Sequence, residues 1–274
     1  VTAYNGGAGT PGETTRYAYD ALGQTSAVGE FAGATSTSNA PTRTETMAYD
    51  VVTGNAIRQE MPEGTVYHAY DPATGQLGAA VQSHWFSVGA IVIWAEPGVG
   101  AVATQSFIEV SYGPNGLALM RDGTSAAEAL KALLAKDEHT NVRQVGMVDA
   151  KGGVAVHTGD KAIAAHCDIK GVNFTVQANM MENAGVCPAM KSAFEKTTGD
   201  LAERMMAALE AGQGAGGDIR GKQSAAILVV AGDKGVPLWK GKLFDLRVED
   251  SAEPIVELRR LLHVARTYRR MTEG

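Results

Sequence analysis

The sequence predicts an α+β domain whose sheets are faced by helices, preceded by a short turn-rich segment. Apolar, β-branched runs typical of strands gather at both ends of the region after residue 64, and helical patterns lie in its middle and at the C-terminus. Residues 1–63 are instead poor in Leu and Ile and rich in Gly, Thr, Ala and Ser. We therefore divide the chain into a segment, residues 1–63, and a domain, residues 64–274.

A tyrosine-aspartate pattern recurs near the start of the chain, at Tyr17–Gln24, Met47–Asn55 and His68–Gln76. These units resemble the repeats of Rhs-type bacterial surface proteins, in which hairpins stack because a single hairpin cannot bury its own face. So few units predict a small, irregular β-hairpin segment, and a linker that matches by chance is the alternative. The resemblance implies a cell-surface or extracellular location, while a cytoplasmic one stays open.

Strands of the main domain are expected where small and β-branched residues alternate between Gly-containing turns. A continuous apolar run between Gly-rich loops predicts a strand covered on both faces. The expected strands are Leu77–Gln82, Ala90–Trp94, Val99–Thr104, Arg143–Asp149, Val154–Thr158, Ser224–Val230 and Leu243–Val248.

Helices are expected where a capping residue or proline opens a run with helical spacing. Ser125–Glu128 has the pattern of a capping box, and apolar residues follow it on one face. Pro188 starts a helix through Lys196, and Asp200 caps another that ends at Glu210, before Gly212. Pro254–Tyr268 closes the chain as an amphipathic helix.

Composition excludes several classes of function. The net charge of -6 offers no basic surface for nucleic acid, and the arginines after Glu257 fit the solvated face of a helix. No apolar stretch approaches the roughly 20 residues that span a bilayer. A polar start at Val1 in place of Met predicts a fragment or a processed product.

No metal or cofactor is expected. Cys167 and Cys187 lack paired C-x-x-C spacing, which favours neither a disulfide framework nor a zinc ribbon. With His157 and His166 added, the one compact pair is the adjacent His166–Cys167, whose side chains would diverge on a strand. The glycine-rich stretch 212–217 follows a helix instead of a strand, so it is no phosphate or dinucleotide loop.

Several motifs after residue 64 together resemble the bacterial domain-of-unknown-function family numbered 1028. The motifs are Tyr70–Gly78, Val99–Gln105, Ser111–Pro114, Arg143–Gly146, His157–Gly159, Gln177–Met180, Gly217–Ala226 and Asp245–Val248.

That family is similar to the N-terminal nucleophile (Ntn) hydrolases, so the resemblance implies a four-layer αββα sandwich and hydrolysis of an amide bond. In such enzymes the first residue of the mature chain attacks the carbonyl, and its free α-amine is the base. The resemblance makes Gly64–Thr65 the candidate processing point and Thr65 the catalytic nucleophile. The register of the motif places Thr65 one position away from the hydroxyl residue usual in relatives, and such a shift turns a strand side chain to the opposite face.

Six polar residues are candidate substrate-binding groups. Gln105 and Asn179 each follow an apolar strand and could donate to an oxyanion, although satisfied amides at strand ends fit equally well. Asp218, Arg220, Gln223 and Ser224 lie on a Gly-bounded loop that enters a strand. Arg220 could clamp a carboxylate, or it could pair with Asp218 to fix the loop.

The leading hypothesis is an Ntn-type hydrolase of a small amide or peptide-like C–N bond. A non-catalytic cell-surface binding or assembly module on the same fold is the alternative. Strand edges and paired helices favour a homo-oligomer. Tyrosines in residues 1–63 make cell-wall carbohydrate a further candidate partner.

Overall fold

The computed structural model describes residues 13–19, 25–32, 43–46 and 64–273, and the chain divides into two compact units, Val1–Glu60 and Met61–Gly274. In the first unit β1 (Glu13–Tyr19), β2 (Thr25–Ala32) and β3 (Arg43–Thr46) form an antiparallel sheet in that order. The second copy of the tyrosine-aspartate pattern and most of the first lie outside the described residues.

The second unit is an α+β domain with two antiparallel sheets. Its six-stranded sheet has the order β10-β11-β4-β5-β12-β13, and its four-stranded sheet has the order β6-β7-β8-β9. The strands are β4 (Gly64–Tyr70), β5 (Leu77–Ser83), β6 (Ile93–Glu96), β7 (Gly100–Ser106), β8 (Arg143–Asp149), β9 (Val154–Thr158), β10 (Cys167–Gly171), β11 (Phe174–Ala178), β12 (Ser224–Val230) and β13 (Lys242–Val248). The third copy of the tyrosine-aspartate pattern belongs to this unit, as the end of β4 and the turn into β5.

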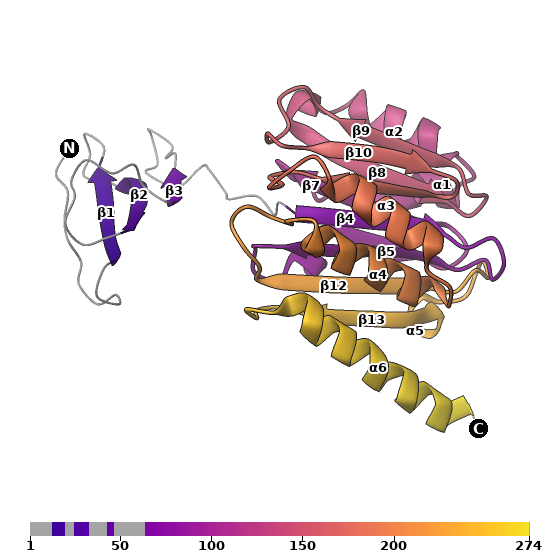
Figure 1. Ribbon diagram of the computed structural model, residues 1–274. Helices are drawn as coiled ribbons and strands as arrows, with labels where there is room; N and C mark the ends of the chain where they lie inside the picture. Colours follow the sequence, from indigo (N-terminus) through magenta and orange to yellow (C-terminus); the bar gives the residue numbers. More distant parts are fainter. Residues whose placement is uncertain (1–12, 20–24, 33–42, 47–63, 274) are drawn as a thin grey trace. The chain divides into compact units, whose positions relative to one another are not determined.

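Helices cover the outer faces of both sheets, while the inner faces pack on each other (Figure 1). α3 (Val186–Lys196), α4 (Leu201–Gly214) and α6 (Pro254–Glu273) lie on the six-stranded sheet. α1 (Tyr112–Arg121) and α2 (Ala126–Leu134) lie on the four-stranded sheet, and a short α5 (Leu238–Gly241) precedes β13.

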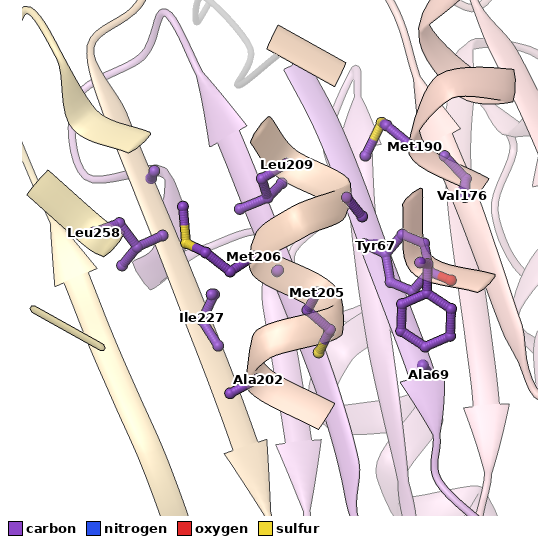
Figure 2. Close-up of a cluster of buried hydrophobic side chains, with 14 of the residues drawn as sticks. Tyr67, Ala69, Val176, Met190, Ala202, Met205, Met206, Leu209, Ile227 and Leu258 are labelled. Atoms are coloured by element: carbon purple, nitrogen blue, oxygen red, sulfur yellow. The ribbon is translucent and has the colours of Figure 1, made fainter. Parts of the chain in front are cut away.

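The alternation of strand side chains decides which layer each residue enters. On β4, Tyr67 and Ala69 pack under α3 and α4, with Met205, Met206, Leu209, Ile227 and Leu258 in the same core (Figure 2). Val66, the residue between, packs between the two sheets. A third core, which includes Leu117, Leu130 and Met147, fills the layer beneath α1 and α2.

Most predicted elements are confirmed, and the capping signals are confirmed in detail. The Ser125 side chain accepts from the Glu128 N–H in a complete capping box, and the Asp200 side chain accepts from the Glu203 N–H at 2.8 Å. The helix after Asp200 does not end before Gly212, because α4 continues to Gly214. A Cβ at Gly212 would lie 2.9 Å from Met190 Cγ, so this glycine lets α3 and α4 approach closely.

Four features were missed or wrongly placed. The strand expected at Ala90–Trp94 begins only at Ile93, after a 3-10 turn. Helix α1, with two glycines and a proline, and the hairpin of β10 and β11 were not predicted. Cys167 and Cys187, from which no disulfide was expected, form one that joins β10 to the first turn of α3.

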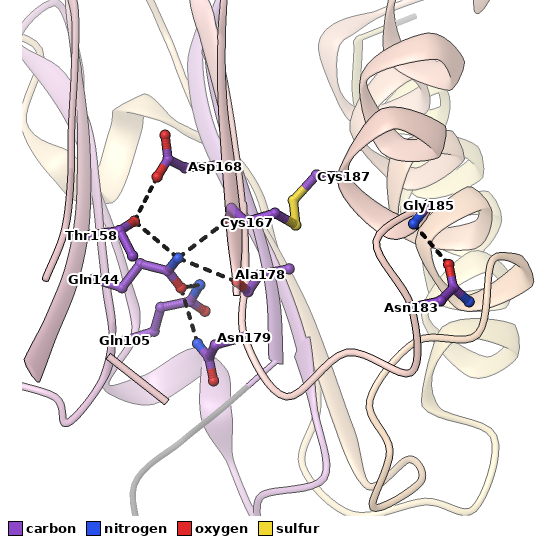
Figure 3. Close-up of a disulfide and its surroundings, with 10 residues drawn as sticks. All are labelled: Gln105, Gln144, Thr158, Cys167, Asp168, Ala178, Asn179, Asn183, Gly185 and Cys187. Atoms are coloured by element: carbon purple, nitrogen blue, oxygen red, sulfur yellow. Dashed lines mark hydrogen bonds between the residues drawn. A yellow bond between two sulfur atoms is a disulfide. The ribbon is translucent and has the colours of Figure 1, made fainter. Parts of the chain in front are cut away.

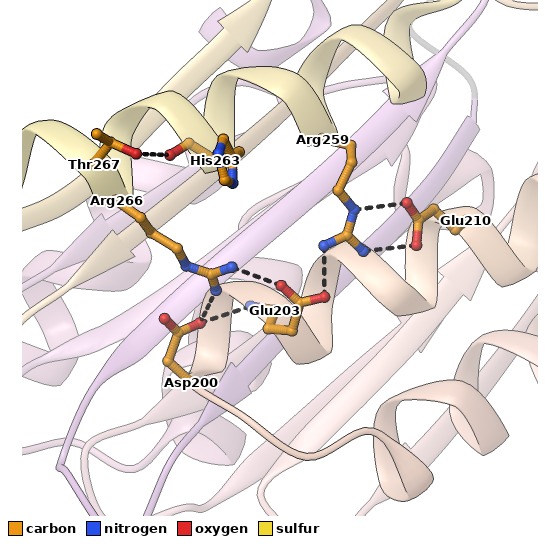
Figure 4. Close-up of polar contacts among 7 residues, drawn as sticks. All are labelled: Asp200, Glu203, Glu210, Arg259, His263, Arg266 and Thr267. Atoms are coloured by element: carbon orange, nitrogen blue, oxygen red, sulfur yellow. Dashed lines mark hydrogen bonds and ion pairs between the residues drawn. The ribbon is translucent and has the colours of Figure 1, made fainter.

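The arginines of α6 are more than a solvated face. Arg259 pairs with Glu203 and Glu210 of α4, and Arg266 pairs with Glu203 and Asp200 (Figure 4). Exposed ion pairs are worth little singly, but bidentate contacts in a network fix geometry. This network holds α6 against α4.

Candidate functional site

Polar residues from both sheets meet at the end of the domain where β4 begins. Gly64 lies opposite Ser83, the last residue of β5, and Ser83 also lies opposite Ser224, the first residue of β12. In the other sheet the end of β7 lies opposite the start of β8. A hydrogen bond from Asn179, just after β11, to Gln144 on β8 joins these two edges.

Three amide side chains form the centre of this region, and we call Gln105, Gln144 and Asn179 the amide cluster (Figure 3). Gln105 Nε2 and Asn179 Nδ2 both donate to Gln144 Oε1, at 2.6 and 3.1 Å. Gln144 Nε2 contacts the Thr158 hydroxyl at 3.1 Å and the carbonyl oxygens of Ala178 and Cys167 at 3.2 and 3.3 Å. All three amides are buried.

The cluster leaves two buried oxygens without a hydrogen-bond partner in the described residues, Gln105 Oε1 and Asn179 Oδ1. The residue after each amide has a left-handed backbone, with φ 64° at Ser106 and φ 55° at Met180. A left-handed backbone conformation costs a non-glycine residue about 1–3 kcal/mol, and such residues gather at functional sites. The backbone is therefore strained at Ser106 and Met180, the residues that directly follow the two amides with unpartnered oxygens.

A second set of buried polar side chains lies deeper between the sheets, and we call His68, Thr175 and Gln177 the inner group. Their buried polar atoms have no hydrogen-bond partner in the described residues. These atoms are both ring nitrogens of His68, the side-chain oxygen and nitrogen of Gln177, and the Thr175 hydroxyl. Burial alone lowers the pKa of His68 to about 3, so the imidazole is neutral at physiological pH.

Gly146 on β8 makes room for the inner group. A Cβ at this position would lie 2.2 Å from His68 Cε1 and 2.4 Å from Gln177 Oε1. The two side chains therefore converge on the backbone of the opposite sheet, and only glycine is compatible with that approach.

Thr65 lies near this region in the backbone but not in the direction of its side chain. It is paired on β4 between Gln82 and Ala178, and it alternates with Val66, so its side chain lies on the helix-covered face with Tyr67. Thr65 Oγ1 is buried and has no partner among the described residues. The carbonyl of Gly64 accepts from the Asn179 N–H at 3.2 Å.

The loop candidates have structural partners. Arg220 makes a bidentate pair with Asp218, at 3.0 and 2.6 Å, and Asp218 also accepts from the His84 N–H. Ser224 Oγ donates to the Trp85 carbonyl and accepts from the Val88 N–H, and Gln223 donates to Asp250. These contacts fix the loop in place.

A polar pocket of about 380 Å³ lies beside α1 and is lined by residues that include Tyr112, Asp137 and Arg143. Burial would raise the pKa of Asp137, but hydrogen bonds from Arg143, the His139 N–H and Tyr112 outweigh it and lower the pKa to about 2. The charge of Arg143 is paired with Asp137, and Arg143 also donates to the Phe107 carbonyl at 2.6 Å. These contacts fix Arg143 at the start of β8.

Within residues 64–273, no three His, Cys, Asp or Glu side chains are placed to hold a metal ion. None of the described helices is both long and apolar enough to cross a membrane.

Comparison with known proteins identifies the family of this chain. The model of a family of unknown function, DUF1028, matches residues 67–258. The chain belongs to the DUF1028 family. The crystal structure of a DUF1028 protein, SPO2555 from Silicibacter pomeroyi, superposes with a TM-score of 0.67 and 27% identity, covering 75% of this chain and 86% of that one. Among functionally curated proteins no match is found.

Anbu, the ancestral beta-subunit from Yersinia bercovieri, matches with a TM-score of 0.33 and 9% identity over 75% of this chain and 95% of that chain. The DUF1028 match includes the amide cluster and the inner group, whereas Gly64 and Thr65 precede it.

The sequence pointed to Gln105 and Asn179 but not to Gln144, Gln177 or His68. A glutamine within an otherwise apolar strand is the signal that could have found Gln144 and Gln177, because a buried amide needs partners. The structure brings Gln105 and Asn179 together and leaves Gln223 and Ser224 in separate contacts.

Proposed function

We propose that this DUF1028 domain is a four-layer αββα sandwich of Ntn-hydrolase type that binds a small amide or peptide-like molecule at the amide cluster and hydrolyses its C–N bond. The observation that carries the proposal is the set of buried, unpartnered amide oxygens where the two sheets meet. Leaving such groups unpaired costs about 1–3 kcal/mol each, so a bound molecule that pairs with them gains that energy.

Thr65 is the proposed nucleophile, and hydrolysis requires a cut between Gly64 and Thr65. The cut would free the α-amine of Thr65 and release the residue from its constrained place in β4, so that the hydroxyl could turn toward the amide cluster. Thr65 Oγ1 would then attack the substrate carbonyl and pass its proton to the α-amine. The amine product leaves with that proton, and water hydrolyses the resulting ester.

A second candidate function is a non-catalytic binding module. The observation that favours it is the orientation of Thr65, whose side chain lies on the opposite face of β4 from Val66 and His68. In that case the amide cluster binds its ligand without cleaving it.

Intact mass and N-terminal sequencing of the freshly purified chain separate the two. A new terminus at Thr65, retained in Thr65→Ser and absent in the isosteric Thr65→Val, supports the hydrolase. A chain still joined through Gly64–Thr65 in all three proteins refutes the nucleophile and leaves the binding module.

Carbohydrate binding through residues 1–63 and homo-oligomerisation stay predictions of the sequence. Glycan binding with and without residues 1–63 tests the first, and light scattering across micromolar concentrations tests the second.

A further inference from the structure

The direction of each group in the amide cluster is fixed by the backbone. The carbonyl oxygens of Cys167 and Ala178 can only accept, so the Gln144 atom beside them is the NH2 group. The oxygen of Gln144 therefore lies on the other side, and the groups that reach it from Gln105 and Asn179 must be their NH2 groups. Flipping any one of the three amides would place two like groups together.

The cluster consequently presents acceptors. Gln105 Oε1 and Asn179 Oδ1 are the buried atoms left over, and an amide oxygen accepts but never donates. A carboxylate, which has only acceptor oxygens, would repel them. A molecule that pairs with them must bring N–H or O–H donors.

A charged ligand would also find no counter-charge. Among the described residues, the buried ionic side chains are Arg143, Asp149 and Asp218, and each already has partners. Arg143 is held by Asp137, Asp149 accepts three backbone N–H groups, and Asp218 is paired with Arg220. Burying an uncompensated charge is far more costly than burying a neutral polar group.

The inner group completes the set of contacts. Gln177 has both a donor and an acceptor without partners, and the neutral ring of His68 likewise offers one of each. Gln177 lies two residues before Asn179 in the sequence. In the complex inferred below, the inner group donates to the carbonyl oxygen of a molecule whose NH2 group lies against Gln105 and Asn179. Since both of these amides lie where the chain leaves a sheet, a ligand would enter from that end of the domain.

We infer that the amide cluster binds an uncharged ligand with a free NH2 group beside a carbonyl, a primary carboxamide or a urea-like molecule, and rejects the corresponding acid. This inference rests on the proposed binding site and specifies its ligand. If hydrolysis also takes place there, the substrate is a primary amide, and water converts it to a carboxylic acid and ammonia.

The test uses the full chain with Thr65→Val, so that no turnover disturbs the binding equilibrium. Titration calorimetry or ligand-observed NMR compares butyramide with butyrate, butylammonium and N,N-dimethylbutyramide, which share nearly the same carbon skeleton. We expect butyramide to bind at least tenfold more tightly than the other three. Gln105→Met should weaken butyramide binding at least tenfold, whereas Gln76→Met, the same substitution at the far end of the β4–β5 hairpin, should leave it unchanged.

Equal binding of butyrate, butylammonium or the dimethyl amide overturns the inference, as does undetectable binding of butyramide. An equal loss in Gln76→Met overturns the role of Gln105. Hydrolysis is scored separately, as ammonia release by the unaltered chain. Selective amide binding without ammonia release refutes the hydrolase but retains this inference, and cleavage of substituted amides alone does the reverse.

Discussion

Replacing Cys167 and Cys187 together by alanine removes the covalent link between β10 and α3. β10 is an edge strand that pairs only with β11 in its sheet, so the disulfide is a major constraint on it. The cysteines are separated by 20 residues in the sequence. Closing a loop of that length lowers the entropy of the unfolded chain by an amount worth about 3 kcal/mol at 25 °C.

For a domain of this size, each kcal/mol corresponds to about 2–4 °C in the melting temperature. We therefore expect the double variant to melt about 6–12 °C below the unaltered chain. The assay is thermal unfolding followed by circular dichroism, with and without a thiol-free phosphine reductant. The reductant should lower the melting temperature of the unaltered chain toward that of the double variant and leave the variant itself unchanged.

A double variant that melts within about 2 °C of the unaltered, oxidised chain would refute this reasoning. A shift by the reductant in the variant as well would show that the reductant acts elsewhere.

Three further predictions concern the inner group and a helix start. Gly146→Ala should cost about 1–3 kcal/mol in denaturant unfolding, because its Cβ would overlap His68, and at least half of that cost should vanish in a His68→Ala background. The pKa of His68 is lowered from 6.5 to about 3, so the unfolded chain binds a proton in this window that the folded chain does not. Stability should then fall as the pH drops from 6.5 toward 3, by about 1.4 kcal/mol per pH unit relative to His68→Gln, and parallel pH profiles of the two proteins would contradict this. Ser125→Ala should cost about 1 kcal/mol through loss of the capping box, while Ser125→Asp, which retains a capping oxygen, should keep most of that stability in the same melt.

Local signals in the sequence determined much of the secondary structure. The capping box at Ser125, the capping residue Asp200 and the continuous apolar run of β12 each act within a few residues, so a single chain is enough to interpret them. Signals of this kind failed where packing overrides propensity. A glycine often ends a helix, but Gly212 lies within α4 and permits close contact with Met190.

The sequence predicted only some of the residues of the candidate site. Gln105 and Asn179 could be proposed because each follows an apolar strand. Gln144, which orients both, lies inside a strand whose sequence predicts only burial, and its importance depends on two carbonyls from the other sheet.

The tertiary structure alone decided the rest, because register and sheet packing are not local. Pairing with β5 and β11 determines that Thr65 lies under the helices while Val66 and His68 lie between the sheets. The approach of β8 to β4 and β11 places Gly146 against His68 and Gln177. The hairpin of β10 and β11 brings Cys167 to Cys187, two residues that no spacing rule connects.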